Sequence, residues 1–384
     1  MGGKKDPKKA KTRNEKKHVN KGSVGELPTY TAIDLFAGIG GIRLGFEYPT
    51  SRPPVKYDGN TRIRTVGVCE IDENAIATYC NYFNDTEKTS ICRDIHDYGV
   101  NETEKTCVDI CMAGFPCQAF SMAGKREGTS DKRGRLFYEV TRICKIYKPK
   151  VIFCENVKGL LSMGGPTEID PDTHLKIGSV FRGMKAELEA MDYTVHYAVL
   201  NSVYFGVPQN RERVYIVAFN NKKIRNDTFT FPIQTRDETN TIDNILDSNP
   251  STDLYLSEQY LNTLKRHRQY HESKSHGFGY IVKKRNEGMT SNALMCGGMG
   301  RERNLVYDPI ELPVTNDRGK KLNAEGIRMM SPLEWERLQG FPDGYTSVVS
   351  KTHRYNQLGN TVTVNVIQHI SENIFKVLDD PDNQ

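Results

Sequence analysis

Short, continuous apolar runs alternate with helix-like amphipathic stretches over the first 219 residues of the chain. The runs match strands that are buried on both faces of a sheet, and they lie at residues 31–36, 65–69, 108–113, 151–154, 193–200 and 214–219. Between two of these runs, residues 136–147 place Val140 and Ile143 on one helical face. This alternation predicts a doubly wound α/β domain over residues 28–219, with ligands bound at the carboxyl ends of its strands.

The alternation stops between residue 220 and about residue 325. Gly, Asn, Lys, Arg and His are frequent there, and basic residues gather at 265–268, around His276 and from Arg301 to Arg303. We expect these side chains to stand on glycine-rich loops, where basic and amide groups anchor phosphates and read base edges. The region therefore predicts a smaller, irregular second domain, residues 220–350, that reads the substrate.

Regular structure returns near the carboxyl end of the chain. Ser331 and Pro332 are suited to the N-cap and first position of a short helix. A second, apolar helix is predicted at 364–377, and it has too little partner surface of its own. We expect residues 351–384 to return to the first domain and to dock on it.

The amino-terminal residues differ in composition from the rest of the chain. Residues 1–21 carry nine Lys or Arg against two acidic residues, with almost no large apolar side chains. We predict a disordered basic arm over residues 1–27. Such an arm either adds non-specific phosphate contacts or only solubilises the chain.

Composition narrows the class of protein. The chain has 384 residues, of which 37% are hydrophobic and 26% charged, which is enough to bury a substantial core. No run approaches about 18 apolar residues and no apolar segment follows the amino-terminal charges, so we expect a soluble, cytoplasmic protein. The nine cysteines form no CxxC pair, so we expect reduced thiols and no bound metal. The net charge of +5 permits a polyanionic partner without requiring one.

A glycine-rich turn at residues 37–41 follows the first strand. Gly38 and Gly40 let the backbone approach a ligand at a helix amino terminus, and a nucleotide-type cofactor is the natural occupant. The spacing is not the GxGxxG of dinucleotide sites, so a simple tight turn remains the alternative. Glu70, just past the second strand, is suited to a ribose diol. Asp94 ends a shorter third segment, where it either accepts from an adenine amino group or is only a loop residue.

A cysteine and a carboxylic acid follow the next two strands. Cys117 leaves its strand before a loop rich in Gly, Lys and Arg, where a nucleophile belongs, although a small packed side chain is the alternative. Glu155 lies at the end of the following strand, on the same rim of the sheet. Burial at this rim can keep a carboxyl group protonated and let it act as an acid.

Arg211 and Arg213 are separated by one residue on an extended segment. Side chains at alternate positions of a strand point to the same side, which suits bidentate anchoring of a phosphate or carboxylate. A surface ion-pair ladder with Glu212 is the alternative.

Together, these blocks closely resemble the cytosine carbon-5 DNA methyltransferases. Six blocks stand in the family order over residues 30–378, namely Asp34 to Gly41, Pro116-Cys117-Gln118, Glu155-Asn156-Val157, Gln209 to Arg213, Arg328 through Leu338 to Pro342, and Gly359 to Val362. Any single block is a weak signal, whereas six in order are specific. The resemblance implies a Rossmann-like methyltransferase domain joined to a target-recognition domain. It also implies S-adenosyl-L-methionine as cofactor and double-stranded DNA as substrate.

The resemblance implies roles for individual residues. Cys117 would add to carbon-6 of a flipped cytosine, protonated Glu155 would hydrogen-bond ring N3, and Arg211 and Arg213 would position the base. Residues 121–135 would form a loop that closes over the base. Cofactor contacts are implied for Phe36, Gly38, Gly40, Glu70, Ile71, Asp94, Ile95, Pro116, Leu136, Asn360 and Thr361, and DNA contacts are predicted for Ser121, Lys125, Arg126, Arg301 and Arg303.

The same resemblance implies the modification enzyme of a bacterial restriction system. We expect a monomer, associated with the nucleoid through DNA, whose functional partner is a cognate restriction endonuclease. A transfer-RNA cytosine methyltransferase is the nearest rival, and the long second domain disfavours it. A catalytically idle DNA-binding regulator is a rival from another class, which the intact Cys117 and Glu155 disfavour. Side-chain directions in an irregular domain do not follow from composition, so the recognised DNA sequence is not predicted.

Overall fold

The computed structural model describes residue 2 and residues 29–49, 61–84, 90–100, 107–116, 136–274, 279–296, 301–309, 315–316 and 319–383. The predicted basic arm, apart from Gly2, lies outside these residues. So does the stretch 117–135, which contains Cys117, Ser121, Lys125 and Arg126. Within the described chain, no helix is long and apolar enough to cross a lipid bilayer.

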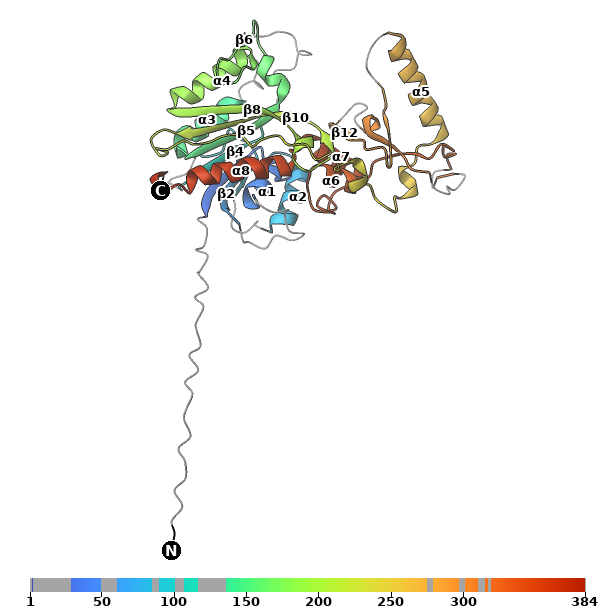
Figure 1. The fold of residues 1–384 in the computed structure, drawn as a ribbon, viewed down its shortest axis with the longest axis horizontal. Coiled ribbons are helices and arrows are strands. Elements are labelled where there is room, and N and C mark those ends of the chain that lie inside the picture. The colour runs from blue at the N-terminus through green and yellow to red at the C-terminus, as the bar shows by residue number, and fades with distance from the viewer. Residues whose placement is uncertain are drawn as a thin grey trace.

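A seven-stranded sheet forms the centre of the larger domain (Figure 1). Its strand order is β3-β2-β1-β4-β5-β10-β8, and β10 runs antiparallel to its neighbours β5 and β8 while the other pairs are parallel. The strands are β1 (Tyr30–Leu35), β2 (Ile63–Cys69), β3 (Ser90–Cys92), β4 (Ile110–Ala113), β5 (Val151–Val157), β8 (Tyr193–Asn201) and β10 (Glu212–Asn220). The strand order reverses between β1 and β4, so the predicted doubly wound α/β class is confirmed.

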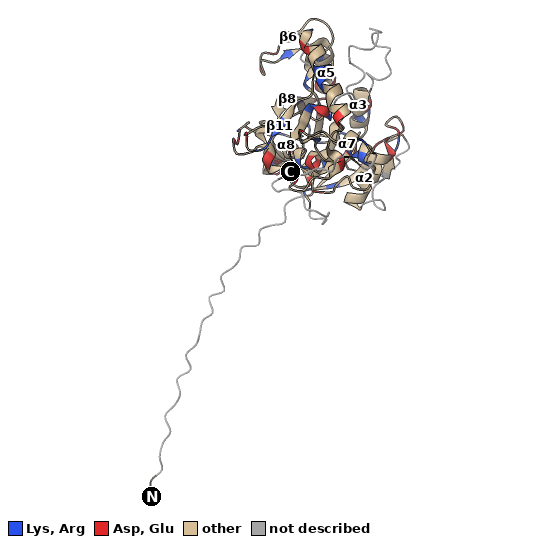
Figure 2. Ribbon diagram, turned by 90° about the vertical axis from the view of Figure 1, so that its right-hand side faces the viewer, with Lys and Arg blue, Asp and Glu red and all other residues tan. Residues whose placement is uncertain are grey.

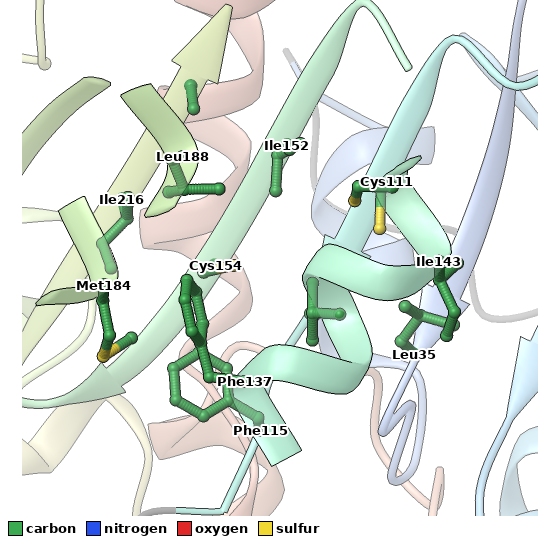
Figure 3. Packing of buried hydrophobic residues seen from close by; sticks show 14 of the residues in the cluster. Leu35, Cys111, Phe115, Phe137, Ile143, Ile152, Cys154, Met184, Leu188 and Ile216 are labelled. Atoms are coloured by element: carbon green, nitrogen blue, oxygen red, sulfur yellow. The ribbon is translucent and has the colours of Figure 1, made fainter. Parts of the chain in front are cut away.

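Helices α3 (Leu136–Tyr147) and α4 (Ser179–Ala190) cover one face of this sheet. The apolar stripe of α3 faces inward, and Figure 3 shows Phe137 and Ile143 with Leu35, Cys111 and Ile152 of the strands in one buried cluster. Because helices cover both faces, β4 is buried at every position. This is why its sequence reads as a continuous apolar run.

Helices α1 (Gly41–Glu47) and α8 (Val364–Leu378) pack together on the opposite face (Figure 1). Gly45 allows their close approach, since a Cβ at this position would lie 2.4 Å from the Ile367 side chain. The Ser371 hydroxyl of α8 donates to the Gly45 carbonyl at 2.8 Å. The carboxyl end of the chain therefore docks on the domain in which the first strand lies.

The smaller domain contains a three-stranded sheet of β11 (Val282–Lys284), β13 (Leu305–Tyr307) and β14 (Ile327–Met329). Helix α5 (Glu258–Ser273) packs on it through Leu261 and Leu264. Residues 265–268 lie within α5, so the expectation that these basic residues stand on a glycine-rich loop was wrong. The apolar face of α5 buries only two leucines, which is too narrow to give a clear helical period.

Two short helices, α6 (Pro332–Leu338) and α7 (Lys351–Asn360), lie between the domains. Ser331 and Glu334 form a capping box at the start of α6, as the predicted N-cap requires. Trp335 packs in one cluster with Leu44 of the larger domain and Val306 of the smaller one. The predicted division into four parts stays a prediction. The remaining elements are α2 (Glu73–Phe83), β6 (Glu168–Ile169), β7 (Lys176–Ile177), β9 (Gln209–Asn210) and β12 (Ser291–Asn292).

Candidate active site

The carboxyl ends of four parallel strands lie side by side in the large sheet. Leu35 of β1 pairs with Cys69 of β2 and with Ala113 of β4, and Ala113 pairs with Cys154 of β5. The residues that follow these strand ends therefore meet at one edge of the sheet. We take this edge as the candidate active site.

The turn after β1 has a backbone conformation that glycine favours. Gly38 and Gly40 have φ values of 55° and 84°, and Phe36 also has a positive φ of 54°. The first strand therefore ends at Leu35, one residue earlier than predicted. A Cβ on Gly40 would lie 2.5 Å from the Phe83 ring, whereas nothing lies within 4 Å of a Cβ on Gly38. The backbone at Gly38 is thus open to a ligand.

Glu70 closes the glycine turn from the side of β2. Its Oε2 accepts from the amide of Gly38 at 2.7 Å, and its Oε1 accepts from the amides of Ile71 and Asp72 at 2.9 and 2.8 Å. Oε2 therefore has a further lone pair, which can accept from a hydroxyl group. The Ile71 side chain is 74% exposed and gives this corner an apolar surface.

Asp94 and Ile95 follow the short third strand and differ in exposure. Oδ1 of Asp94 accepts from the His96 amide at 3.0 Å and lies 2.7 Å from His96 Nδ1. These hydrogen bonds lower the pKa of Asp94, so its carboxylate is ionised at neutral pH and can accept from an amino group. Ile95 is buried in the hydrophobic core, and its carbonyl accepts from Arg142 Nη2 at 2.9 Å.

Asn360 and Thr361 reach the glycine turn from the end of α7. A Cβ on Gly41 would lie 2.8 Å from the Thr361 hydroxyl, so the two segments are in close contact. Asn360 is exposed, and its Oδ1 lies 2.6 Å from Cys296 Sγ. Two other predicted cofactor residues lie at element ends: Pro116 is exposed after β4, and Leu136 is partly buried at the start of α3.

Glu155 contacts Arg213 across the pair of strands β5 and β10. Arg213 Nε lies 3.2 Å from Glu155 Oε1, and the two side chains are only 17% and 12% exposed. Burial raises the pKa of Glu155, while the positive charges of Arg213 and Arg211 act in the opposite direction. A buried carboxyl group with a raised pKa can hold a proton for donation. Glu212 pairs instead with Lys158, at 3.0 Å.

Arg211 is fully buried and faces main-chain carbonyl groups. Its Nη1 donates to Leu294 at 2.8 Å, and its Nη2 donates to Thr361 at 2.7 Å and to Gly359 at 3.3 Å. Burial lowers the pKa of Arg211 to about 9, and the charge of Arg213 acts in the same direction. The two predicted arginines therefore have different partners in this structure.

Asn156 has a structural role that sequence reasoning did not assign. Its Nδ2 donates to the Phe115 carbonyl at 2.9 Å, and its Oδ1 accepts from the Val157 amide at 2.8 Å. Asn156 thus ties the end of β5 to the backbone that leads from β4 into Cys117. The only signal in the sequence was its place beside Glu155.

Asp34 is a second group that sequence reasoning missed, because it stands within the apolar run of the first strand. It is completely buried, and neither carboxyl oxygen has a hydrogen-bond partner among the described residues. Burial raises the pKa of Asp34 to about 7, while the charge of Arg43 acts in the opposite direction. The group lies three residues before the glycine turn at 37–41 and carries a titratable proton near neutral pH.

The two predicted DNA contacts that the structure describes lie in the smaller domain. Arg301 stacks over the Tyr355 ring at 4.5 Å, and the exposed Arg303 places Nη1 2.8 Å from Met295 Sδ. Basic and acidic segments are interspersed along the described ribbon (Figure 2). The other three predicted DNA contacts lie in the stretch that is not described.

A family model for C-5 cytosine-specific DNA methylases matches residues 30–376, which include all the residues placed above. The chain belongs to this family. The Type II methyltransferase M.HpaII of Haemophilus parainfluenzae is 42% identical over 355 residues, covering 91% of this chain and 90% of the relative. The Type II methyltransferase M1.ScrFI of Lactococcus lactis subsp. cremoris is 36% identical, covering 91% of this chain and 79% of the relative.

Solved structures of similar fold extend the comparison beyond close relatives of this cytosine-C5 DNA methylase. The Entamoeba histolytica methyltransferase EhMeth has a TM-score of 0.64 at 20% identity, covering 92% of this chain and 98% of that one. The S. pombe Dnmt2 methyltransferase has a TM-score of 0.64 at 18% identity, covering 91% and 98%. At such identities the likeness concerns the fold alone, which is the Rossmann-like methyltransferase class.

Cytosine-C5 DNA methylases use S-adenosyl-L-methionine, and the edge of this sheet fits that cofactor. Glu70 and Asp94 offer carboxylate oxygens to hydroxyl and amino donors, and Ile71 offers an exposed apolar surface. The open backbone at Gly38 leaves room for close approach. Acceptors and an apolar surface at one sheet edge are what an adenosine group requires.

Proposed function

We propose that this cytosine-C5 DNA methyltransferase acts through a covalent bond between the Cys117 thiolate and carbon-6 of its target cytosine. The observation that carries the proposal is the buried carboxyl group of Glu155, with its raised pKa, beside the guanidinium of Arg213. A proton donor fixed next to a cation suits the N3 edge of a cytosine ring, where negative charge develops during addition.

The chemistry of cytosine explains why these groups are needed. Carbon-5 is a poor nucleophile, so addition of the thiolate to carbon-6 moves the electrons of the 5,6 double bond toward carbon-5, while Glu155 gives its proton to N3. When bound, S-adenosyl-L-methionine would supply the methyl group that carbon-5 takes up, with S-adenosyl-L-homocysteine as the leaving group. Loss of the carbon-5 proton to solvent then restores the double bond and expels the Cys117 thiolate. N3 returns its proton to Glu155, so the residues end in their starting state.

The neighbours of these groups hold them in place. Asn156 fixes the Phe115 carbonyl, and so fixes the direction in which the chain enters Cys117. Arg213 holds the carboxyl group of Glu155 and orients the base beside it. Arg211 is buried and acts indirectly, because it fixes the main-chain carbonyl groups of Leu294 and Thr361.

The cofactor would be held by the residues around the glycine turn. Glu70 would accept from the ribose hydroxyls, Asp94 from the adenine amino group, and Ile71 would pack against the adenine ring. The methionine end would lie near the turn and near the segment after α7. The residues proposed there, or lining the rest of the pocket, are Phe36, Gly38, Gly40, Ile95, Pro116, Leu136, Asn360 and Thr361.

The reacting base must leave the DNA stack, because carbon-6 and N3 are not accessible to Cys117 and Glu155 inside a duplex. Residues 121–135, with Ser121, Lys125 and Arg126, would then close over it, while Arg301 and Arg303 would contact DNA from the smaller domain. The relatives are named Type II methyltransferases, which supports a role in a restriction–modification system. A cognate endonuclease as functional partner and a monomeric enzyme on nucleoid DNA are part of the proposal.

Bisulfite sequencing of DNA from a host without cytosine methylation tests this function. Expression of the wild-type chain should protect one cytosine within a short recurring sequence, and Cys117→Ala should abolish that protection. Cys107→Ala is the matched control, because Cys107 is exposed and precedes the amino end of β4, whereas the candidate site lies at the carboxyl ends of the strands. Protection of the cytosine by Cys117→Ala would exclude Cys117 as the nucleophile. If 5-methylcytosine were found in transfer RNA and not in DNA, the result would favour a transfer-RNA substrate.

A further inference from the structure

Residues 291–294 of the smaller domain pass along the larger domain and are held from both sides. Strand β12 pairs with β9, and the Ser291 amide donates to the Pro208 carbonyl at 2.7 Å. From the smaller domain, the buried side chain of Asn304 bonds both backbone groups of Asn292, accepting from its amide at 2.8 Å and donating to its carbonyl at 3.0 Å. This short segment is therefore a joint between the domains.

Two side chains of the larger domain bond the backbone of the last residue of this joint. Gln209 Oε1 accepts from the Leu294 amide at 3.0 Å, and Arg211 Nη1 donates to the Leu294 carbonyl at 2.8 Å. Gln209 and Arg211 are 0% and 2% exposed. Because both backbone groups of Leu294 are satisfied by buried side chains, the main chain has little freedom to shift there.

The same two side chains also reach the carboxyl-terminal part of the chain. Gln209 Nε2 donates to the Leu338 carbonyl at 2.9 Å, and Arg211 Nη2 donates to the Thr361 carbonyl at 2.7 Å. A Cβ on Gly359 would lie 2.5 Å from the Cys296 amide nitrogen, so the backbones of these two segments are in direct contact. Three segments distant in sequence are thus fixed against one another at this point.

We propose that Gln209 and Arg211 are positioning residues that hold Leu294, and so place Met295, Arg301 and Arg303 relative to Glu155 and Arg213. Arg213, two residues after Arg211, contacts Glu155 at the candidate active-site edge. A shift at Leu294 would therefore separate the DNA-contacting residues from the reacting groups. The inference rests on the proposed DNA contacts of Arg301 and Arg303.

The contacts involve the main chain of Leu294 and not its side chain. The side chains after Leu294 can therefore differ without breaking the hydrogen bonds from Gln209 and Arg211. These hydrogen bonds fix the position of the following side chains, and they do not determine which base each side chain contacts. Loss of these hydrogen bonds should lower the preference for the correct DNA site more than it lowers the affinity for the cofactor. A merely structural role would change the stability of the fold and leave this preference unchanged.

Gln209→Leu removes both functional groups of the amide at similar volume, and Gln368→Leu is its matched control. Gln368, which lies on α8, is also buried, and it donates to the Tyr48 carbonyl at 2.7 Å. The substrates are duplexes that carry either the mapped site or that site with one base pair changed. Gln209→Leu should raise the KM for the correct duplex by about tenfold, which corresponds to one lost buried hydrogen-bonding group. It should also lower the ratio of kcat/KM for the correct duplex to kcat/KM for the changed duplex.

Calorimetric titration with S-adenosyl-L-homocysteine should give the same affinity for wild type and Gln209→Leu. Gln368→Leu should lower the melting temperature while KM and site preference stay at wild-type values. Equal KM and preference in both variants would overturn the inference. If Gln209→Leu does not fold, Asn304→Ala, which loosens the same joint from the other domain, decides by the same criteria. A wild-type enzyme that methylates no duplex would instead refute the proposed function.

Discussion

Two Arg–Glu pairs differ in how fully they are buried and hydrogen-bonded. We call the pair Arg213–Glu155, at the candidate active-site edge, the open pair, and the pair Arg328–Glu334, between the domains, the closed pair. Arg213 and Glu155 share one contact of 3.2 Å, and both side chains keep some exposure. Arg328 binds Glu334 through two parallel contacts of 2.9 and 2.8 Å, and both side chains are 0% exposed. The two pairs use the same residue types and differ in their surroundings.

The surroundings of Glu334 are saturated with hydrogen bonds. Besides Arg328, its carboxylate accepts from the amides of Ser331 at 2.6 Å and Asp247 at 2.9 Å. Arg328 in turn binds Asp308 at 2.8 Å. A carboxylate held by so many fixed donors serves the fold. Burial raises the pKa of Glu155, and among the described residues its carboxyl group forms one ion pair, so it is less fully bonded than that of Glu334. Incomplete pairing is what marks the active-site edge.

The largest expected effect is on stability, at the closed pair. Arg328→Met should lower the free energy of unfolding by about 3–5 kcal/mol, because it leaves the buried carboxylate of Glu334 without the guanidinium that binds it, whereas Asp308 keeps Arg285. Arg213→Met should cost less, since Glu155 can take up a proton when its partner is lost. Denaturant unfolding of both variants gives the comparison. Equal losses would show that the two pairs are equally structural.

The next effect is on catalysis, at the open pair. Glu155→Gln should lower kcat by roughly a hundredfold or more, because the amide cannot give a proton to N3, while unfolding changes little. The proton-bearing form of Glu155 is lost as pH rises through its raised pKa, so wild-type kcat should fall on the alkaline side. The variant should lack this fall. A pH–rate profile of both proteins measures it, and identical profiles would remove the acid role.

A smaller effect concerns Asp34, whose buried carboxyl oxygens have no hydrogen-bond partner among the described residues. Its folded-state pKa of about 7 is above its unfolded value of 3.8, so the folded protein retains the proton more strongly. Its contribution to stability is therefore complete below about pH 4 and is lost as pH rises to 7. Between pH 5 and 8, wild type should lose about 3 kcal/mol more stability than Asp34→Asn. Parallel stability curves for the two proteins would contradict the burial argument.

The smallest effect is expected in the smaller domain. Arg303→Ala should weaken DNA binding a few-fold and reduce the slope of log K against log salt by about one, as loss of one phosphate contact does. Arg64→Ala is the control, because Arg64 is exposed at the amino end of β2, far along the strand from the active-site edge. Equal slopes for both variants in fluorescence anisotropy titrations would place Arg303 outside the DNA interface.

The large sheet was predicted from the sequence, and the edge where the candidate site residues meet was expected from it, because both depend on local pattern. Strand ends are readable where apolar runs stop, and Glu70 and Glu155 stand at those stops. Parallel strands then bring their carboxyl ends together without further information. The order of strands β8 and β10 beyond β5 was not predicted, since antiparallel pairing over these distances leaves no local signal.

The contacts of Arg211 illustrate what sequence could not supply. Its partners Leu294 and Thr361 lie 83 and 150 positions away, and they are main-chain groups that any residue would offer. Neither periodicity nor residue type marks such partners. Helix α5 was missed for a different reason, since its buried face consists of Leu261 and Leu264 alone. Sequence therefore predicts where regular elements end better than it predicts what fixes them to one another.

The central claim is that Cys117 bonds to carbon-6 of cytosine, and trapping that bond tests it most directly. A duplex carrying 5-fluorocytosine at the mapped site lacks the carbon-5 proton, so elimination cannot release the thiolate. Mass spectrometry of the digested complex should find the nucleotide on the peptide that contains Cys117. Cys296, which contacts Asn360 at the same site, is the cysteine to distinguish from it. Label on Cys296, or no covalent complex despite methylation of the normal duplex, would contradict the account.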